Sequence, residues 1–473
     1  MSRPYTRRTK IIATLGPATE SPEMIRAMIL AGVNIFRINM SHAQHEQVRN
    51  AVRDIRKISS ELITRTSIMM DSRGPEIRTG EVSQNLNLVA GQRIGVTVRG
   101  EKSEEEVSVD VNYDQLVEDI RVGDVVLIDN GTIELKVLQK KHNQLVCDVL
   151  TPGTLGSRRH VNLPGVRVNL PSLTQQDKED IKLGVELGVD WFAMSFVREP
   201  EDVLRLKSIL DYHNAPQKVI AKLEDQEGVR NLDQIIDIAD GVMVARGDLG
   251  IECPYEELPI IQRRIVKRCA LMGKPVIVAT HMLESMIENP SPTRAEITDT
   301  ANAVYEQADA IMLSGETSVG RYPLKCVEIM NRIAARIEQS GGAGYYDCAV
   351  MASKYAKLVK SAAVLASECN ADALIVFTNT GVIARNAAWL RQVSTPIFAF
   401  SSDETLLNQL PLYWGIQPSY LETGHDPEQN VSRAVAKLKE RNQLSPGDTV
   451  VAVTEVMING HFVDTILMET VEG

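Results

Sequence analysis

The sequence predicts an α/β fold: a (β/α)8 TIM barrel with an inserted small all-β domain after strand 3 and a C-terminal open-sheet α/β domain. Three observations lead to this prediction. Apolar runs alternate with amphipathic stretches over much of the chain, more than a hundred residues of another texture interrupt them, and the texture changes again after about residue 341. A chain of 473 residues is also too long for one compact core.

Eight short apolar runs, rich in β-branched residues, are the predicted barrel strands. They are continuous rather than alternating, as in parallel strands that are covered on both faces. Amphipathic segments between them, such as 22–32, 201–213 and 254–273, are the predicted helices. The strands are KIIATLG (10–16), NIFRINM (34–40), TSIMMD (66–71), WFAMSF (191–196), KVIAKLE (218–224), GVMVARGD (241–248), KPVIVAT (274–280) and AIMLSGE (310–316).

The interval between Asp71 and Trp191 is too long for one strand-helix connection. It contains RIGVTVRG, DVVLIDNG, TIELKVLQ and LVCDVLTPG, which are short runs separated by turn residues. This spacing is typical of a small all-β domain. Pro75 on one side and residues 162–171 on the other are the expected hinge segments.

The chain beyond about Gly341 predicts a separate open α/β domain. The runs at 371–381, 395–403, 448–456 and 463–471 alternate with helical stretches such as 431–441. The predicted boundaries are 1–73 and 171–340 for the catalytic barrel, 74–170 for an inserted β-barrel lid domain, and 341–473 for a C-terminal α/β regulatory domain.

Composition narrows the class of protein. A formal charge of −11 argues against a nucleic-acid binder, which needs basic patches for phosphate contacts. No window approaches the roughly 20 apolar residues of a membrane span, and the basic N-terminus has too short an apolar run for a signal peptide. The six cysteines form no CxxC pair, which favours reduced thiols. We therefore expect a cytoplasmic protein with no nucleic-acid or membrane partner.

Polar residues gather at the predicted carboxyl ends of the strands, where catalytic residues of this barrel type lie. A single polar strand end is ordinary, but seven converging on one rim predict an active site. These residues are Arg37, Asn39, Ser41 and His42; Asp71, Ser72 and Arg73; Ser195; Lys222 and Glu224; Arg246 and Asp248; Thr280 and His281; Ser314 and Glu316.

Glu224 and Asp248 end adjacent strands, and such an oxygen-rich set without His or Cys suits Mg²⁺ or Mn²⁺ rather than Zn²⁺. Lys222 lies two residues before Glu224, so both side chains point to the same face of the strand. The lysine is compatible with two roles: stabilising a transferring phosphoryl group, or forming a Schiff base as in aldolases. The fixed fork of Arg37 suits a bound phosphate or carboxylate.

Other strand-end residues predict further contacts. Gly247 lets a ligand approach the backbone, and a short helix near Asp248 would offer N–H groups to an anion. Thr280 and Ser314 carry hydroxyls suited to relaying a proton. A second oxygen-rich cluster with only one formal charge suits a weakly charged cation such as K⁺; its members are Asn39, Ser41, Asp71 and Ser72.

Several stretches together closely resemble the pyruvate kinase family. They are TKIIATLGPAT, NIFRINMSH, MDSRGPEIRTG, VNLPGV, AKLEDQEGV, DGVMVARGDLGIE, ATHMLESMIENPSPTRAEITDTANAV and ADAIMLSGETSVGRYP. The resemblance covers roughly residues 8–340 and, more weakly, the C-terminal domain. PTRAE with DTANAV, together with MVARGDLG, is highly specific.

The resemblance implies transfer of the phosphoryl group of phosphoenolpyruvate to ADP, giving pyruvate and ATP in glycolysis. Glu224 and Asp248 would hold the divalent cation, and Lys222 and Arg37 would contact the phosphoryl group. The resemblance also assigns the remaining sites. The substrate carboxylate would contact Gly247, Asp248 and Thr280, and a proton would reach the enolate through Thr280 and Ser314. K⁺ would bind Asn39, Ser41, Asp71 and Ser72. The nucleotide phosphates would contact Arg78, Arg159 and Asn162 of a lid that closes over the site.

Glu76 stands where K⁺-dependent members of the family have glutamate and K⁺-independent members have lysine, so K⁺ dependence is expected. The family also implies a homotetramer and a phosphorylated small-molecule effector bound at Thr378, Thr380 and Gly381, in a loop that opens a helix. Several residues depart from the family pattern, so the identity of the effector and the effect of these residues on the active site and on lid closure stay open. They are His281, Asp225, Asn130, the SRRH stretch at 157–160, and Ile383.

Two other functions fit parts of the pattern. A barrel lyase acting on keto-acids with Mg²⁺ shares Lys, Glu and Asp at strand ends, but it explains neither the inserted domain nor PTRAE. A catalytically silent regulator on this fold would be expected to lack Lys222, Glu224 or Asp248, and all three are present.

Overall fold

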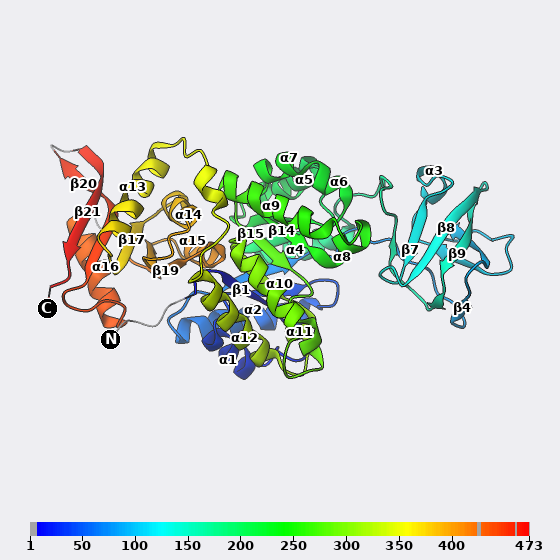
Figure 1. Cartoon of the computed structure of the whole chain (residues 1–473), viewed down its shortest axis with the longest axis horizontal. Helices are drawn as coiled ribbons and strands as arrows, with labels where there is room; N and C mark the ends of the chain where they lie inside the picture. The colour runs from blue at the N-terminus through cyan, green and yellow to red at the C-terminus, as the bar shows by residue number, and fades with distance from the viewer. Residues whose placement is uncertain (1–6, 423–426, 459–460, 473) are drawn as a thin grey trace.

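The structure, a computed structural model, describes residues 7–422, 427–458 and 461–472. It confirms the predicted fold class. Three bodies lie in a row: the C-terminal α/β domain (yellow to red) at one end, the barrel (blue and green) in the centre, and the inserted β domain (cyan) at the other end (Figure 1). We retain 1–73 with 171–340, 74–170 and 341–473 as proposed domain boundaries.

The barrel is closed by eight parallel strands in the order β1-β16-β15-β14-β13-β12-β3-β2. Almost every strand residue is buried, because side chains on one face fill the barrel interior while those on the other face pack against the helices. Continuous apolar runs are therefore what this geometry requires. The strands are β1 Lys10–Thr14, β2 Ile35–Asn39, β3 Ser67–Asp71, β12 Trp191–Met194, β13 Lys218–Leu223, β14 Gly241–Ala245, β15 Val276–Ala279 and β16 Ala310–Leu313.

The barrel helices begin and end at local sequence signals. In the first helix, the Ser21 side chain accepts a hydrogen bond from the Met24 N–H, Pro22 occupies the first turn, and Gly32 ends the helix at φ 113°. The helices are α1 Pro22–Ala31, α2 His45–Glu61, α4 Gln175–Leu187, α5 Pro200–Tyr212, α6 Gln226–Arg230, α7 Leu232–Ile238, α8 Arg246–Glu252, α9 Leu258–Met272, η1 Glu284–Ile287, α10 Arg294–Tyr305, α11 Gly315–Ser318 and α12 Pro323–Glu338.

The insertion follows β3 and has its own apolar core. Its strands form a six-stranded sheet, β11-β7-β8-β9-β5-β6, and a two-stranded sheet, β10-β4. The two chain segments that join it to the barrel meet at an isolated bridge between Arg78 and His160. Its elements are β4 Leu86–Leu88, β5 Arg93–Val98, β6 Ser108–Val111, α3 Leu116–Asp119, β7 Val125–Ile128, β8 Ile133–Lys140, β9 Gln144–Thr151, β10 Gly153–Leu155 and β11 Val161–Asn162.

The C-terminal domain is an open sheet in the order β19-β18-β17-β20-β21, parallel except for the last pair. Strand β19 was not expected from the sequence, because Pro418 lies within it. A proline is tolerated there because β19 is an edge strand. The elements are η2 Tyr345–Cys348, α13 Lys354–Glu368, β17 Ala373–Phe377, α14 Val382–Trp389, β18 Ile397–Ser401, α15 Glu404–Gln409, η3 Leu410–Leu412, β19 Ile416–Tyr420, α16 Pro427–Glu440, β20 Thr449–Ile458 and β21 His461–Thr470.

The C-terminal domain packs against the amino ends of the barrel strands, and the two share one apolar core. At this junction Asp309, which precedes β16, accepts two hydrogen bonds from the buried Arg391 guanidinium at 2.8 and 2.6 Å. The ammonium of Lys10 donates to the Ile416 carbonyl at 2.7 Å. The carboxyl ends of the strands thus face the insertion. Within the described ranges, no helix is both long and apolar enough to cross a membrane.

Candidate active site

A cavity of about 500 Å³ lies at the carboxyl ends of the barrel strands, beside the insertion. Eight of the predicted site residues line it, from strands far apart in the sequence. They are Arg37, Asn39, Ser41, Ser72, Arg78, Lys222, Glu224 and Asp248, joined by His42, Arg73, Glu76, Arg158, Ser195 and Phe196.

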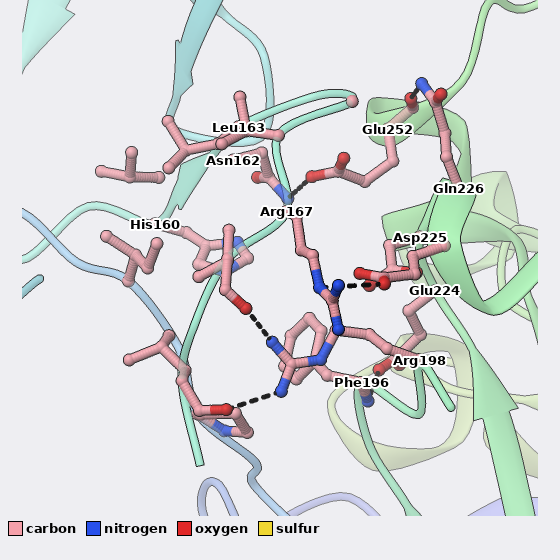
Figure 2. Close-up of a pocket in the computed structure, with 18 of the residues that line it drawn as sticks. His160, Asn162, Leu163, Arg167, Phe196, Arg198, Glu224, Asp225, Gln226 and Glu252 are labelled. Carbon is pink, nitrogen blue, oxygen red and sulfur yellow. Dashed lines mark hydrogen bonds and ion pairs between the residues drawn. The ribbon is translucent and has the colours of Figure 1, made fainter. Parts of the chain in front are cut away.

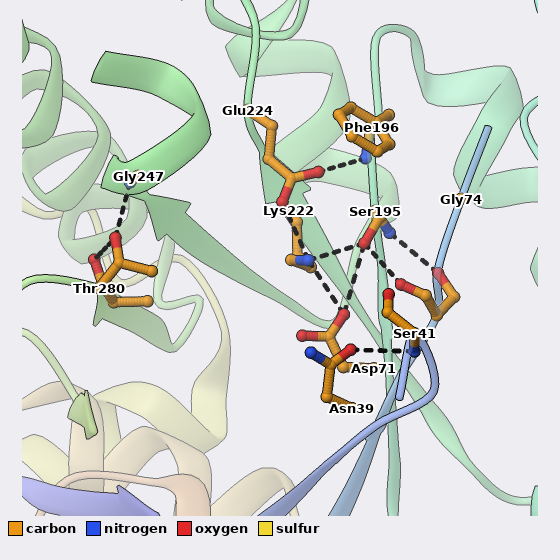
Figure 3. A network of polar contacts seen from close by, with 12 residues as sticks. Asn39, Ser41, Asp71, Gly74, Ser195, Phe196, Lys222, Glu224, Gly247 and Thr280 are labelled. Carbon is orange, nitrogen blue, oxygen red and sulfur yellow. Dashed lines mark hydrogen bonds and ion pairs between the residues drawn. The ribbon is translucent and has the colours of Figure 1, made fainter. Parts of the chain in front are cut away.

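The Lys222 ammonium is the centre of the polar network at this cavity (Figure 3). Its Nζ lies 2.9 Å from Glu224 Oε1 and 3.0 Å from Asp71 Oδ1. It also donates to Ser195 Oγ at 2.7 Å, and that hydroxyl donates to the Ser72 carbonyl at 2.7 Å. All three protons of the ammonium therefore have acceptors, so its position is fixed.

Charge keeps the lysine protonated. Burial alone would lower the pKa of Lys222, but Asp71 and Glu224 outweigh burial and raise that pKa above its usual value. A Schiff-base lysine needs a neutral amine to attack a carbonyl. Of the two roles that the sequence left open, the network therefore favours a fixed positive charge over a nucleophile.

The two buried carboxyls beside Lys222 differ. Burial would raise the pKa of Asp71, but Arg37 and Lys222 outweigh burial, and that pKa is lowered. Arg37 Nε lies 2.6 Å from Asp71 Oδ2. For Glu224, burial dominates: burial, with a smaller contribution from the nearby Asp248, outweighs Lys222 and raises the pKa to about 7. Asp71 thus serves as a permanent anion that positions both cations.

Backbone geometry orients Glu224 from its other side. The Phe196 N–H donates to Glu224 Oε2 at 2.6 Å, and Phe196 adopts φ 53°. Gly74, itself at φ 72°, lies directly against it: a Cβ placed there would come within 2.8 Å of the Phe196 ring. The glycine after Arg73 is therefore required for the approach of the two chain segments.

The carboxylates of Glu224 and Asp248 fit a hard divalent cation. They come from the ends of β13 and the first turn of α8, and their charges are close enough to repel. Within the described ranges, no group of three or more His, Cys, Asp or Glu side chains is placed to hold a metal. Two carboxylates are what Mg²⁺ commonly takes from a protein, with water and substrate phosphates filling the other positions.

The second oxygen cluster lies on the same wall of the cavity, at the ends of β2 and β3. Asn39 Oδ1 accepts the Ser41 N–H at 3.1 Å, and Ser72 Oγ accepts the Ser195 N–H at 3.1 Å. Asp71 is already neutralised by Arg37 and Lys222. Oxygen donors with little uncompensated charge fit a monovalent cation better than a divalent one.

The segment MVARGD contains an internal clamp. Strand β14 ends at Ala245, and α8 starts at Arg246, whose side chain is only 7% exposed. Its guanidinium donates to the Ala279 carbonyl at 3.1 Å, to the Thr280 carbonyl at 2.6 Å and to Asp299 Oδ1 at 2.7 Å. Arg246 therefore holds the end of β15 in place.

The clamp supports an unusual backbone. Thr280 and His281 both have positive φ, 66° and 54°, a conformation that is costly for non-glycine residues. Thr280 Oγ1 accepts the Gly247 N–H at 2.6 Å (Figure 3). The helix start expected beside Asp248 is present, and Gly247 and Thr280 are in direct contact.

Six residues predicted for the active site are not among those that line this cavity: Asp71, Gly247, Thr280, Ser314, Arg159 and Asn162. Ser314 Oγ is buried, without a hydrogen-bond partner among the described residues. Arg159 pairs with Asp129 inside the insertion at 3.3 Å. Asn162 Nδ2 donates to Glu252 Oε1 at 3.0 Å. Conversely, Ser195, Phe196 and Arg158 belong to the cavity; of these the sequence indicated only Ser195, as a polar strand end.

A second cavity of about 270 Å³ separates the insertion from α6 and α8 (Figure 2). Arg198 lines this cavity and donates a hydrogen bond to the Leu170 carbonyl at 2.7 Å. This bond links the predicted hinge segment 162–171 to the barrel. Burial raises the pKa of Glu252 to about 7. The His160 and Phe196 rings lie 6.4 Å apart between the two cavities.

The predicted effector loop lies in the C-terminal domain, between β17 and α14. Gly381 precedes α14 at φ 79°, and the Thr380 carbonyl accepts from Arg385 at 3.1 Å. Thr378 is buried, with no partner for its hydroxyl among the described residues. The loop is distant from the active-site cavity, because the barrel separates the two ends of the molecule (Figure 1).

Comparisons with known proteins identify the family of the chain and agree with its fold. The family model "Pyruvate kinase, barrel domain" matches residues 6–327, and "Pyruvate kinase, alpha/beta domain" matches 356–467. Plastidial pyruvate kinase 3 of Arabidopsis thaliana is 42% identical over 94% of this chain and 78% of its own length. A Staphylococcus aureus pyruvate kinase is 39% identical over 95% and 78%. The crystal structure of a Cryptosporidium parvum pyruvate kinase superposes with a TM-score of 0.92, at 33% identity, over 98% of this chain and 96% of that one.

Proposed function

This chain belongs to the pyruvate kinase family and is a phosphotransferase, and we propose that it uses the cavity around Lys222 to transfer the phosphoryl group of phosphoenolpyruvate to ADP. The products would be pyruvate and ATP, and the reaction would serve glycolysis. The observation that carries this proposal is the Lys222 ammonium, held by Asp71, Glu224 and Ser195 at the wall of the cavity.

Lys222 and Arg37 would supply the positive charge that phosphoryl transfer needs. The transferred group passes through a loose transition state in which charge is spread over its equatorial oxygens, so positioning and electrostatics account for most of the catalysis. Both cations are fixed by the same Asp71 carboxylate, at 3.0 and 2.6 Å. They are therefore preorganised and need little movement during the reaction.

Glu224 and Asp248 would hold Mg²⁺ or Mn²⁺, and Asn39, Ser41, Asp71 and Ser72 would hold K⁺. A bound divalent cation supplies a link between substrate oxygens and screens phosphate charge. Glu76, which lines the cavity and lies 2.6 Å from Arg78, supports the proposed K⁺ dependence.

The substrate carboxylate would meet the Gly247–Asp248 backbone and Thr280. In the structure the Gly247 N–H is bonded to Thr280 Oγ1, so substrate would compete for that donor and free the hydroxyl. The Thr280 hydroxyl would then be available to relay a proton to the enolate. Ser314 remains a proposed relay partner, although its hydroxyl is buried outside the cavity.

ADP phosphates would be contacted from the insertion acting as a lid. Arg78 lines the cavity, and Arg158 is an additional candidate. Arg159 and Asn162 would reach the nucleotide only if the insertion moves relative to α8. The C-terminal domain would bind a phosphorylated effector at Thr378, Thr380 and Gly381, and a homotetramer is the proposed assembly.

The proposal is tested by measuring pyruvate formation from phosphoenolpyruvate and ADP with Mg²⁺, at several K⁺ concentrations and constant ionic strength. We expect saturable pyruvate formation that rises with K⁺. Absence of pyruvate under every condition would refute the proposed function. Activity that ignores K⁺ would refute only the role assigned to Glu76.

A further inference from the structure

A polar pocket of about 400 Å³ lies between the barrel and the C-terminal domain, away from both the active site and the effector loop. Its barrel side is the end of α2 and the loop into β3; its other side is α15, the end of β19 and the end of α16. We call it the junction pocket and define it by six of its lining residues: Ser59, Arg65, Thr66, Ser419, Lys437 and Arg441.

Three hydroxyl side chains of the junction pocket are more than nine-tenths buried and have no hydrogen-bond partner among the residues that the structure describes. Ser59 is 7% exposed, Thr66 1% and Ser419 4%. Burying a hydroxyl without a hydrogen-bond partner costs free energy, so such hydroxyls are rare in protein interiors. Three unpartnered hydroxyls around one cavity indicate that a ligand in the cavity accepts hydrogen bonds from them.

The same pocket holds more positive than negative charge. Arg65 is paired with Glu404 at 3.0 Å, whereas the one acceptor of Lys437 among the residues that the structure describes is the Tyr420 carbonyl, at 2.6 Å. For Arg441 no ion pair occurs anywhere in the described ranges. Burial and the neighbouring cations lower the pKa values of Lys437 and Arg441, and the nearby Glu440 only partly opposes this, so positive charge predominates at this end of the pocket.

We propose that the junction pocket binds a phosphate dianion, either inorganic phosphate or the phosphate group of a small ester, between Lys437 and Arg441 of the C-terminal domain and Thr66 of the barrel. Cations supply the charge, and hydroxyls satisfy the remaining phosphate oxygens. The volume suits a small metabolite. The proposal does not depend on the catalytic assignment.

A ligand that bridges two domains should stabilise their junction. Binding to the folded state alone raises the unfolding temperature by mass action. We would therefore titrate the full-length protein with inorganic phosphate at constant ionic strength and measure the unfolding midpoint, with glycerol 3-phosphate as a parallel arm. A stronger response to the ester identifies an ester site, and equal responses identify a site for free phosphate.

The first test removes the two cations. In Lys437→Gln/Arg441→Gln, apparent phosphate affinity should fall by about tenfold or more, because two charged contacts are lost. The matched control is Arg433→Gln/Lys439→Gln, which removes the same charge from α16, outside the pocket. Any phosphate response from the active site is common to all variants. Equal responses in the two double variants, or no response in the wild type to either probe, would overturn the proposal.

The second test uses two buried threonines in the same state. Thr66 and Thr395 are each 1% exposed with unpartnered hydroxyls, but only Thr66 lines the pocket. Without phosphate, Thr66→Val and Thr395→Val should both keep or raise the midpoint, since each replaces an unsatisfied hydroxyl by a methyl group. With phosphate, only Thr66→Val should lose affinity, by several-fold. A full phosphate response in Thr66→Val would contradict the assigned contact.

Discussion

Replacing Arg246 by lysine keeps the charge of the MVARGD segment but removes its fork, and we expect this change to loosen the end of β15. The wild-type guanidinium donates at once to the Ala279 and Thr280 carbonyls and to Asp299. A single ammonium cannot span these acceptors. If the lysine ammonium stays paired with Asp299, the buried carbonyls of Ala279 and Thr280 both lose their charged donor.

The Ala279 carbonyl keeps a hydrogen bond from Thr280 Oγ1 at 2.7 Å, so only the Thr280 carbonyl is left without a donor in the described part of the chain. An unsatisfied buried acceptor costs about 1–3 kcal/mol, so the barrel should lose about 2 kcal/mol of stability. For a domain of this size the unfolding midpoint should then fall by roughly 4–8 °C. Thr280 would also lose support for its positive φ, and because it contacts Gly247, kcat/KM for phosphoenolpyruvate should fall by about tenfold to a hundredfold.

Scanning calorimetry and steady-state kinetics of Arg246→Lys measure these two effects. Arg263→Lys is the matched control, because that side chain is 61% exposed and pairs loosely with Glu306 at 3.4 Å. The control should behave like the wild type. An Arg246→Lys protein with an unchanged midpoint and unchanged kcat/KM would refute the clamp.

Three further changes test other parts of the site. Gly247→Ala should fold normally, because the added Cβ would lie 3.5 Å from Thr280 Oγ1, an ordinary contact. The methyl group should block the substrate carboxylate and raise KM for phosphoenolpyruvate at least about tenfold. An unchanged KM would contradict the proposed contact between the carboxylate and the Gly247 backbone. Glu76→Lys should make activity independent of K⁺ in a KCl series balanced with choline chloride, and retained dependence would refute its role. Asn162→Asp places a second carboxyl beside Glu252, whose pKa is about 7. Because the new carboxyl replaces a hydrogen-bond donor that lowers the Glu252 pKa, that pKa rises further in the variant. The pair therefore shares a proton at pH 7 and repels at higher pH, so KM for ADP should rise relative to wild type only above pH 7, and a pH-independent ratio would count against the contact.

The barrel strands could be predicted because strands that are buried on both faces must consist of continuous apolar residues. All eight runs coincide with observed strands to within a few residues at their ends. Strand β19 escaped notice because Pro418 argues against a strand unless its edge position is known. Edge position is a property of the tertiary structure and is not visible in a short segment.

The positions of site residues that lie in turns, or that contact another domain, could not be predicted from the sequence. Arg158 adopts φ 57° in a turn of the insertion, and this turn directs Arg158 rather than Arg159 to the cavity. The partner of Asn162 could not be foreseen, because Glu252 lies 90 residues away on another domain. By contrast, Lys222 and Glu224 share one strand, so the period of two residues was enough to place both together.

In the proposed reaction, Lys222 stabilises the moving phosphoryl group while Glu224 and Asp248 hold the divalent cation. Lys222→Met separates these roles when kcat and Mn²⁺ affinity, the latter by electron paramagnetic resonance, are measured on the same protein. We expect kcat to fall by about a hundredfold or more. Mn²⁺ affinity should be retained or tightened, because Glu224 loses a competing cation at 2.9 Å. A variant that keeps wild-type kcat, or that loses activity only because Mn²⁺ no longer binds, would contradict these roles.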